Sequence, residues 1–313
     1  MSEKQFLTDY NKDDAKWDYH KDSSEKITYF YETSPFQRHK KYSSRITDCA
    51  SILKFSFLDD FNTGETKLRL SNAQFCRVRL CPVCQWRRSM AWRARLFQKL
   101  PILLSEYENL QFIFLTLTVR NCDIKDLSAH LSLMNEAFRK LRVRAEFKRV
   151  VKGFIRSTEV TKSKSSFAHP HFHCILAVNK SYFTSRDYLK TERWAEIWQD
   201  CLKVDYLPVV DCRKIRQKGT QIESKAVIET LKYTTKIEDL LSDKDWFLNL
   251  TDQLYKKRFI ATGGVFKDIL KNDVSNSDMI KSELNDSEDF EEDTQSLYFG
   301  WNYNHRKYKK INK

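Results

Sequence analysis

Three histidines alternate within one short segment of this chain, His169-Pro-His171-Phe-His173. Successive side chains of a β-strand point to opposite faces, so a strand here would place all three imidazoles on one face and Phe172 on the other. Imidazoles grouped this closely suit a divalent metal ion. The alternative is a polar strand face exposed to solvent. Because three of the chain's 7 histidines lie in this segment, the sequence favours a metal site.

A carboxylate that could complete this site is Glu159, which lies in the preceding strand candidate, residues 152–160. A hairpin through residues 161–168 would bring Glu159 beside the histidines. Mixed histidine and carboxylate ligation with open positions is typical of a catalytic Mg²⁺ or Mn²⁺ rather than of a closed structural zinc site. Taken alone, Glu159 could equally be an exposed strand residue.

The second segment with potential chemistry is Glu229-Thr-Leu-Lys232-Tyr233-Thr-Thr-Lys236. A helix is expected over residues 223–238, and residues three and four apart on a helix lie on one face. The residues that would share this face are Glu229, Lys232, Tyr233 and Lys236. A tyrosine is a weak nucleophile at its ordinary pKa of about 10, but flanking lysines and a metal-polarised phosphate would make its attack feasible. A carboxylate one turn away could activate water. The alternative is an ordinary solvated helix face.

A cysteine cluster and a basic helix precede these segments. Cys81-Pro-Val-Cys84 is a common knuckle, and with Cys76 and Cys49 it could supply four thiolates to a structural zinc, although packed thiols or a redox pair remain alternatives. The helix expected from Trp86 to about Leu104 interleaves arginines with aromatic residues, which suits phosphate contacts and base stacking. Its candidate DNA contacts are Arg87, Arg88, Arg93 and Arg95; a solvated basic helix is the alternative.

The overall composition agrees with a nucleic-acid partner. The 313 residues include 55 Lys and Arg against 42 Asp and Glu, a net charge of +13, while 41% hydrophobic residues suffice for a real core and exclude a wholly disordered protein. Residues 1–26 contain no apolar signal segment, and no apolar run reaches the roughly 20 residues of a membrane helix. We therefore expect a cytoplasmic protein with reduced cysteines and no membrane partner.

The remaining pattern predicts alternating strands and helices. Strands are expected at 112–119, 152–160 and 169–178, and helices at 124–146 and 186–203. The first 45 residues show no sustained period and are interpreted as a basic, aromatic arm. Residues 283–293 hold seven acidic side chains and no basic one, which is typical of a solvated run.

Three segments in order resemble the motifs of rolling-circle plasmid replication initiators of the HUH endonuclease superfamily, in the single-tyrosine branch of Gram-positive plasmids. The first is Phe114-Leu-Thr-Leu-Thr-Val-Arg-Asn121, the second is the histidine segment at 169–173, and the third is the segment at 229–236. The stretch from Phe75 to Ser89 also resembles this family. HxH alone is a weak motif, whereas all three in order on a basic chain are a strong one.

This resemblance implies a chemistry and a fold. His171 and His173 would be the metal ligands, and Tyr233 would attack the scissile phosphate of origin DNA to give a 5′-phosphotyrosyl enzyme and a free 3′-hydroxyl primer. Glu229 would activate water for the closing cleavage, while His169 lies outside the strict pair as ligand or substrate contact. Host helicase and polymerase would be partners on duplex and single-stranded origin DNA. The implied fold is α+β, with a central antiparallel sheet that carries the histidines and packs helices on its other face.

We therefore expect four regions: an arm at 1–45, a zinc-ribbon-like cysteine module with the basic helix at 46–108, a nicking domain at 109–271, and an acidic tail with a basic end at 272–313. Two alternatives remain. One is a relaxase or single-tyrosine transposase with the same chemistry. The other is a zinc-ribbon DNA-binding regulator without catalysis.

Overall fold

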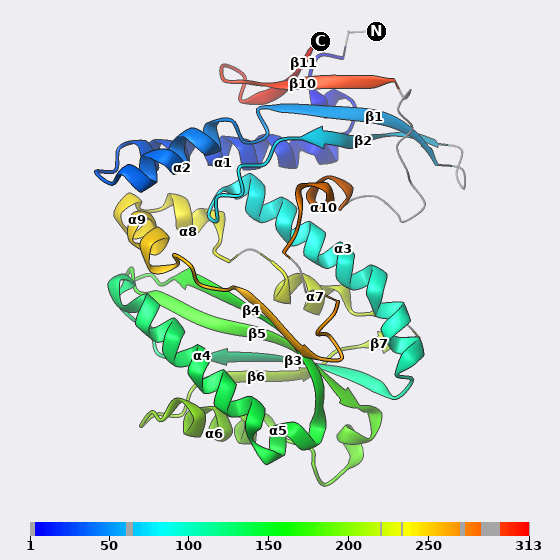
Figure 1. Cartoon of the computed structure of the whole chain (residues 1–313), viewed down its shortest axis with the longest axis vertical. Coiled ribbons are helices and arrows are strands. Elements are labelled where there is room, and N and C mark those ends of the chain that lie inside the picture. Colours follow the sequence, from blue (N-terminus) through cyan, green and yellow to red (C-terminus); the bar gives the residue numbers. More distant parts are fainter. Residues whose placement is uncertain are drawn as a thin grey trace. The chain divides into compact units, whose positions relative to one another are not determined.

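The computed structural model describes residues 4–60, 65–219, 221–232, 234–269, 273–282 and 295–312, and Figure 1 labels most of its helices and strands. The chain divides into two compact units. Unit 1 comprises Met1–Ala94 and Val274–Lys313, and unit 2 comprises Arg95–Asp273. Each unit is built on an antiparallel sheet with helices, so the α+β class predicted from the sequence is confirmed.

Unit 1 contains a four-stranded sheet of order β11-β10-β1-β2. Its strands are β1 (Ile52–Asp60), β2 (Glu65–Ala73), β10 (Ser296–Asn302) and β11 (Lys307–Ile311). Its helices are α1 (Ala15–Glu32), α2 (Gln37–Thr47), the first part of α3 (Pro82–Glu106) and α10 (Asn276–Lys281), with 3-10 turns η1 (Leu7–Asp9) and η2 (Lys12–Asp14). The ring of Trp17 on α1 lies edge-on to Phe55, Trp86 and Tyr308, and these contacts join helices and sheet in one core.

Both ends of the chain differ from the sequence prediction. The expected arm at 1–45 instead contains α1 and most of α2, because α1 buries polar residues such as Lys21 and Ser24 beside Trp17, which hides the apolar period. The expected tail at 272–313 supplies β10, which pairs with β1, and β11. Its acidic run at 283–293 lies outside the described residues. The division between the units falls within α3, at Ala94, and not at residue 108.

Unit 2 contains a five-stranded antiparallel sheet of order β6-β3-β5-β4-β9. Its strands are β3 (Leu110–Thr118), β4 (Val151–Lys162), β5 (Ala168–Asn179), β6 (Val210–Lys214) and β9 (Ile260–Gly264), and a separate ribbon pairs β7 (Gln217–Lys218) with β8 (Gln221–Ile222). Its helical elements, besides the rest of α3, are η3 (Ile124–Asp126), α4 (Leu127–Val143), α5 (Ala145–Val150), η4 (Lys180–Thr184), α6 (Thr191–Leu202), α7 (Ser224–Thr230), α8 (Ile237–Leu241) and α9 (Lys244–Gln253). The strands β3, β4 and β5 were all predicted.

Alternation along β5 divides the sheet into a polar and an apolar face. Phe172 faces the rings of Phe138 on α4 and Trp198 on α6, so these helices lie on the apolar side. The predicted stripe of α4, which includes Leu131 and Met134, is buried. The neighbours of Phe172 in the strand, His171 and His173, point to the opposite face. The central strand β5 is thereby held by packing on one side and presents imidazoles on the other.

The helix predicted at 223–238 is interrupted. α7 ends at Thr230 and α8 begins at Ile237, so Glu229, Lys232 and Lys236 do not share one helix face, and Tyr233 lies outside the described residues. The cause lies in β4, whose partner β9 pairs only with residues Gly153–Ser157. Beyond that point the N–H of Val160 donates to the carbonyl of Thr234 at 2.8 Å, and this bond to the sheet edge competes with continuation of the helix.

Candidate active site and metal centres

The β4–β5 hairpin aligns Glu159 directly opposite His171. The carboxylate oxygen Oε2 of Glu159 lies 2.9 Å from Nε2 of His171 and 2.8 Å from Nε2 of His173. All three side chains are buried. The hairpin that the sequence predicted between residues 161 and 168 therefore does bring this carboxylate beside the histidines.

The outer ring nitrogens of both histidines are also held. Nδ1 of His171 donates to the backbone carbonyl of His169 at 3.2 Å, and Nδ1 of His173 lies 3.2 Å from the hydroxyl of Thr116 on β3. Because Nδ1 carries a proton, Nε2 is the nitrogen with which a neutral His171 imidazole could bind a metal ion beside Glu159. Second contacts of this kind are typical of histidines that bind metal ions.

The donor set fits a divalent cation. Two imidazole nitrogens and one carboxylate oxygen, all within 4.8 Å of one another, form a group that could hold a metal ion. Acceptors that converge in a buried position repel one another unless a cation or a proton lies between them. The strand that carries Thr116 belongs to the first motif of the sequence, but neither period nor composition marked Thr116 as a support of this group.

Lys232 supplies a positive charge at the same point. Its Nζ lies 2.8 Å from the same Oε2 of Glu159. Burial by itself would raise the pKa of Glu159, but hydrogen bonds from His171, His173 and Lys232 outweigh it and hold that pKa well below its usual range. Burial lowers the pKa of His173, which favours the neutral, ligating form of the ring.

His169 lies beside this cluster but outside it. Its ring centre is 5.2 Å from that of His171, whereas its Nδ1 lies 2.5 Å from Oδ1 of Asn121, the residue that ends the first motif. Burial lowers the pKa of His169 as well. Tyr233 lies outside the described residues, although its neighbours Lys232 and Thr234 both bind β4. Lys236 is exposed and directly precedes α8.

Glu229 is partnered by a residue that the sequence did not indicate. Its Oε2 accepts from Nη2 of Arg213 on β6 at 2.7 Å. The Arg213 guanidinium lies 4.6 Å from the ring centre of Phe114, which stacks on His173 with ring centres 5.4 Å apart. The strand β6 has only five residues, too few for a period that would have revealed Arg213.

The four cysteines of unit 1 form a second candidate metal centre. Cys49 follows α2, Cys76 follows β2, and Cys81 and Cys84 lie before and within the first turn of α3. The sulfur of Cys84 lies 3.5 Å from that of Cys49 and 3.6 Å from that of Cys76, and Cys81 is 3.8 Å from Cys49. Backbone N–H groups of Arg77 and Val78 donate to sulfur atoms of the cluster. Such a group could hold a metal ion.

The basic helix is less exposed than the sequence suggested. Arg87 is fully buried, and its guanidinium donates to the carbonyl of Met279 at 2.8 and 2.5 Å and to that of Ile280 at 3.3 Å. Trp86, predicted as a base-stacking residue, is buried against Trp17 and His20. The prediction that Arg87 contacts DNA is therefore wrong. The predicted contacts that stay partly exposed are Arg88, Arg93 and Arg95.

Substitution of Arg87 should affect folding and not DNA contacts. In Arg87→Met, two buried carbonyls lose their donor, so we expect the free energy of unfolding to fall by about 3 kcal/mol. Arg88→Met, on a partly exposed neighbour, should change it by less than about 0.5 kcal/mol. Chemical denaturation measures both. A variant of Arg87 as stable as the wild type, but with weaker salt-dependent DNA binding, would restore the sequence-based assignment.

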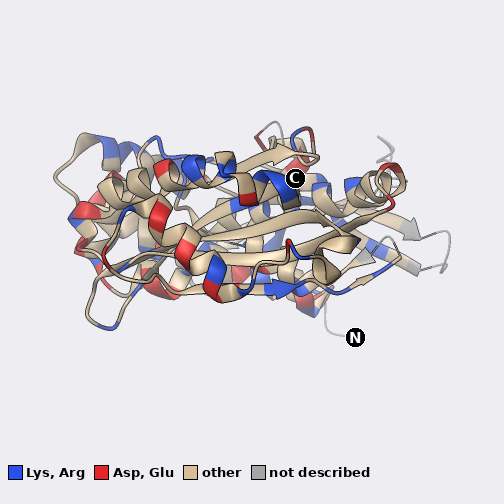
Figure 2. Ribbon diagram, turned by 90° about the horizontal axis from the view of Figure 1, so that it is seen from below, with Lys and Arg blue, Asp and Glu red and all other residues tan. Residues whose placement is uncertain are grey.

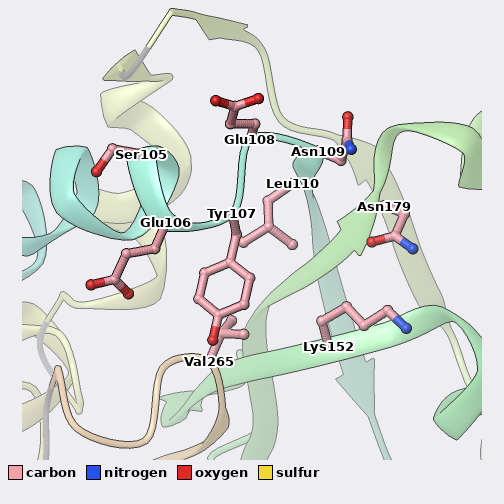
Figure 3. A pocket seen from close by; sticks show the side chains of 9 residues that line it. All are labelled: Ser105, Glu106, Tyr107, Glu108, Asn109, Leu110, Lys152, Asn179 and Val265. Atoms are coloured by element: carbon pink, nitrogen blue, oxygen red, sulfur yellow. The ribbon is translucent and has the colours of Figure 1, made fainter.

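A hollow of about 620 Å³ lies at the other end of the unit 2 sheet, where Leu110 pairs with Asn179. Figure 3 shows the side chains around it: Ser105, Glu106, Tyr107, Glu108, Asn109, Leu110, Lys152, Asn179 and Val265. In the register of β3 and β5 this end is eight residues from the pair of Thr118 and His171. The hollow is therefore separate from the histidine cluster.

These features define an α+β protein whose described residues form one candidate metal centre in each unit. A model of the replication protein family matches residues 67–309. A Protein rep of Streptococcus pneumoniae serotype 2 is 37% identical over 244 residues, covering 75% of this chain and 74% of the relative. A Protein rep of Bacillus amyloliquefaciens is 39% identical over 277 residues and 79% of each chain, and one of Lentilactobacillus hilgardii is 33% identical over 86% of this chain and 87% of its own. No solved structure matches. The chain belongs to the replication protein family.

Two general properties accompany this membership. No helix in the described ranges is both long and apolar enough to cross a membrane. Lys and Arg positions are interspersed with Asp and Glu positions along the ribbon in Figure 2, on a chain whose net charge is +13. An excess of positive charge of this size attracts polyanions over distances set by the salt concentration.

Proposed function

We propose that this replication protein initiates rolling-circle replication at a plasmid origin. It binds duplex and single-stranded origin DNA, and Tyr233 attacks one phosphodiester. The new bond joins the phenolic oxygen to phosphorus, the bond to the 3′ oxygen breaks, and the proton lost by the phenol is balanced by the one that the 3′ oxygen gains. The products are a 5′-phosphotyrosyl protein and a 3′-hydroxyl that primes the host polymerase, with a host helicase as a further partner.

One observation carries this proposal: Glu159, His171 and His173 converge on one point, and Lys232, the residue before Tyr233, binds the same carboxylate oxygen. His171, His173 and Glu159 would hold a catalytic Mg²⁺ or Mn²⁺. Such an ion, when bound, withdraws charge from a phosphate oxygen. Lys232 adds positive charge beside the phosphate. Lys236, which is exposed and four residues further along the chain, contributes to the general attraction of DNA. His169, which binds Asn121, contacts the DNA strand.

The roles of Glu229 and of unit 1 complete the proposal. Glu229 activates water for the closing cleavage, so that one tyrosine suffices for initiation and termination. Cys49, Cys76, Cys81 and Cys84 hold a structural zinc ion that fixes the start of α3, and Arg88, Arg93 and Arg95 contact duplex phosphates. The cysteine cluster would also suit a DNA-binding regulator, which would bind the origin without nicking it.

Removal of the histidine pair should separate cutting from binding. His171→Ala with His173→Ala should abolish nicking and the binding of Mn²⁺, and leave duplex origin binding within about twofold, because phosphate contacts by Lys and Arg dominate affinity. Calorimetric titration with Mn²⁺, a nicking assay and a gel shift measure the three properties. His130→Ala, which changes a partly exposed histidine of α4, is the matched control. Wild-type nicking by the double variant would refute the metal assignment.

Loss of a single cysteine should release the structural ion. We expect about one zinc ion per wild-type chain, and Cys84→Ser should lose it together with part of the folding stability, because binding energy at a structural site is folding energy. Cys212→Ser, which changes a thiol of β6 in unit 2, should retain the zinc content. Elemental analysis and thermal denaturation test this. Wild-type protein that contains no zinc, even after growth in zinc-supplemented medium, would contradict the assignment.

Substitutions of Tyr233 and of Glu229 should block different stages of the reaction. Tyr233→Phe keeps the ring and removes the nucleophilic oxygen, so both the first nick and the covalent adduct should be absent. Glu229→Ala should retain nick and adduct but fail to terminate, because no carboxylate activates water, and products longer than one plasmid unit should accumulate. Denaturing gels of the adduct and of the replication products distinguish these outcomes. A Glu229→Ala protein that cannot nick at all would place Glu229 in the first step.

A further inference from the structure

Arg213 is a cation on the polar face of the unit 2 sheet that no sequence motif includes. In the register of β3 and β6 it lies opposite Phe114, and so shares the face of Thr116 and His173. Its side chain is 42% exposed, and that of its partner Glu229 is 31% exposed. The guanidinium is therefore accessible to solvent, although β6, the strand that carries it, pairs with the inner strand β3.

Three contacts orient this side chain. The Nη2 group donates to Glu229 at 2.7 Å, and the guanidinium lies 4.6 Å from the ring centre of Phe114. Phe114 in turn stacks on His173, one of the three residues of the candidate metal centre. Packing against an aromatic ring restricts the orientation of a guanidinium. The contact is made through the planar face of the guanidinium and does not use its N–H groups.

The hydrogen-bonding capacity of Arg213 is only partly used. A guanidinium has five N–H donors in a rigid fork, and among the described residues its hydrogen bond is the one to Glu229. The fork matches two oxygens of a phosphate, and such charge-assisted pairs are short and strong. An ion pair that is this exposed contributes little stability, so exchange of the carboxylate for a phosphate faces a small barrier in free energy.

We propose that Arg213 binds a backbone phosphate of the single-stranded DNA next to the cleavage point, and that this phosphate replaces Glu229 as its partner. The assignment rests on the proposed function, since it identifies part of the substrate contact of the same site. Glu229 has two states in consequence. Without DNA its carboxylate is paired with Arg213, and with DNA in place it is released at the polar face, where a base toward water is required.

Single-strand binding without metal tests the phosphate contact. Binding of a fluorescent single-stranded origin oligonucleotide is measured by anisotropy in EDTA over a range of salt concentrations. Arg213→Ala should weaken binding about tenfold and reduce the slope of log K against log salt by about 0.7, the value for one phosphate contact on a single strand. Arg139→Ala is the matched control, because Arg139 pairs with Glu136 on α4, which packs on the apolar side of the sheet. It should change neither quantity.

A double-mutant cycle tests the exchange. Glu229→Gln removes the competing charge and should tighten binding severalfold in the wild-type background, but not in the Arg213→Ala background. Equal tightening in both backgrounds would mean simple repulsion between Glu229 and DNA, and would overturn the exchange. An unchanged slope in Arg213→Ala would overturn the phosphate contact. Arg213→Lys, which keeps the charge but not the fork, should retain the slope and lose part of the affinity.

These readouts are independent of cleavage. If the wild-type protein never nicks the origin strand while the cycle behaves as expected, the proposed function fails and the Arg213 contact stands. If the wild type nicks and Arg213→Ala binds single strands with the wild-type slope, the proposed function stands and the Arg213 contact fails.

Discussion

The pairing register of the β4–β5 hairpin is the constraint on which the candidate site depends. A shift by one residue would turn every side chain of one strand to the other face, and Glu159 would then enter the apolar side of the sheet. The other face fixes the register: Phe172 packs on Phe138 and Trp198, and a shift of β5 by one residue would turn Phe172 away from both rings. Packing on one side of β5 thus determines the chemistry on the other.

The difference in length between β4 and β9 is the second constraint. β9 covers only the first part of β4, so the remaining edge is free to bind the segment between α7 and α8. Val160 holds Thr234, while Glu159 holds Lys232. Two consecutive residues of β4 point in different directions and bind the residues on either side of position 233. If α7 and α8 formed one uninterrupted helix, one of its faces would point to solvent, and the helix could not make both contacts.

The sequence predicted those features that depend on local period. The strands β3, β4 and β5 and the helix α4 follow from alternation and from an apolar stripe, and the alternation of His169, His171 and His173 follows directly from strand geometry. The approach of Glu159 required only a hairpin between adjacent strands. Features that depend on distant partners were missed: Arg213 and Thr116 contribute through strands that are neighbours in the sheet but not in the chain.

Burial of polar residues explains the wrong predictions in unit 1. α1 carries Lys21, which is fully buried and donates to the carbonyl of Thr47 while pairing with Glu25, so its charge gives no sign of its position. Arg87 is similar: its charge suggested DNA, but Trp17 and Trp86 flank its guanidinium. In sequence analysis a charged residue is placed at the surface, because burial of a charge costs free energy unless partners are present. In unit 1 those partners come from elements far away in the chain.

The apolar face of the unit 2 sheet also contains a cation, so the presence of charge alone does not distinguish the two faces. Arg156 on β4 is buried between the rings of Phe138 and Phe172, and desolvation lowers its pKa to about 10. Cys174, also buried on this face, has its pKa raised to about 12 by burial. Neither group has a route to the histidines, because the backbone of the sheet lies between. Charged groups therefore occur on both faces of the sheet as described, but on the face of His171 and His173 several buried groups converge beside Lys232 and Arg213, which are partly exposed to solvent. Convergence and access together, and not charge alone, distinguish the candidate site from the core.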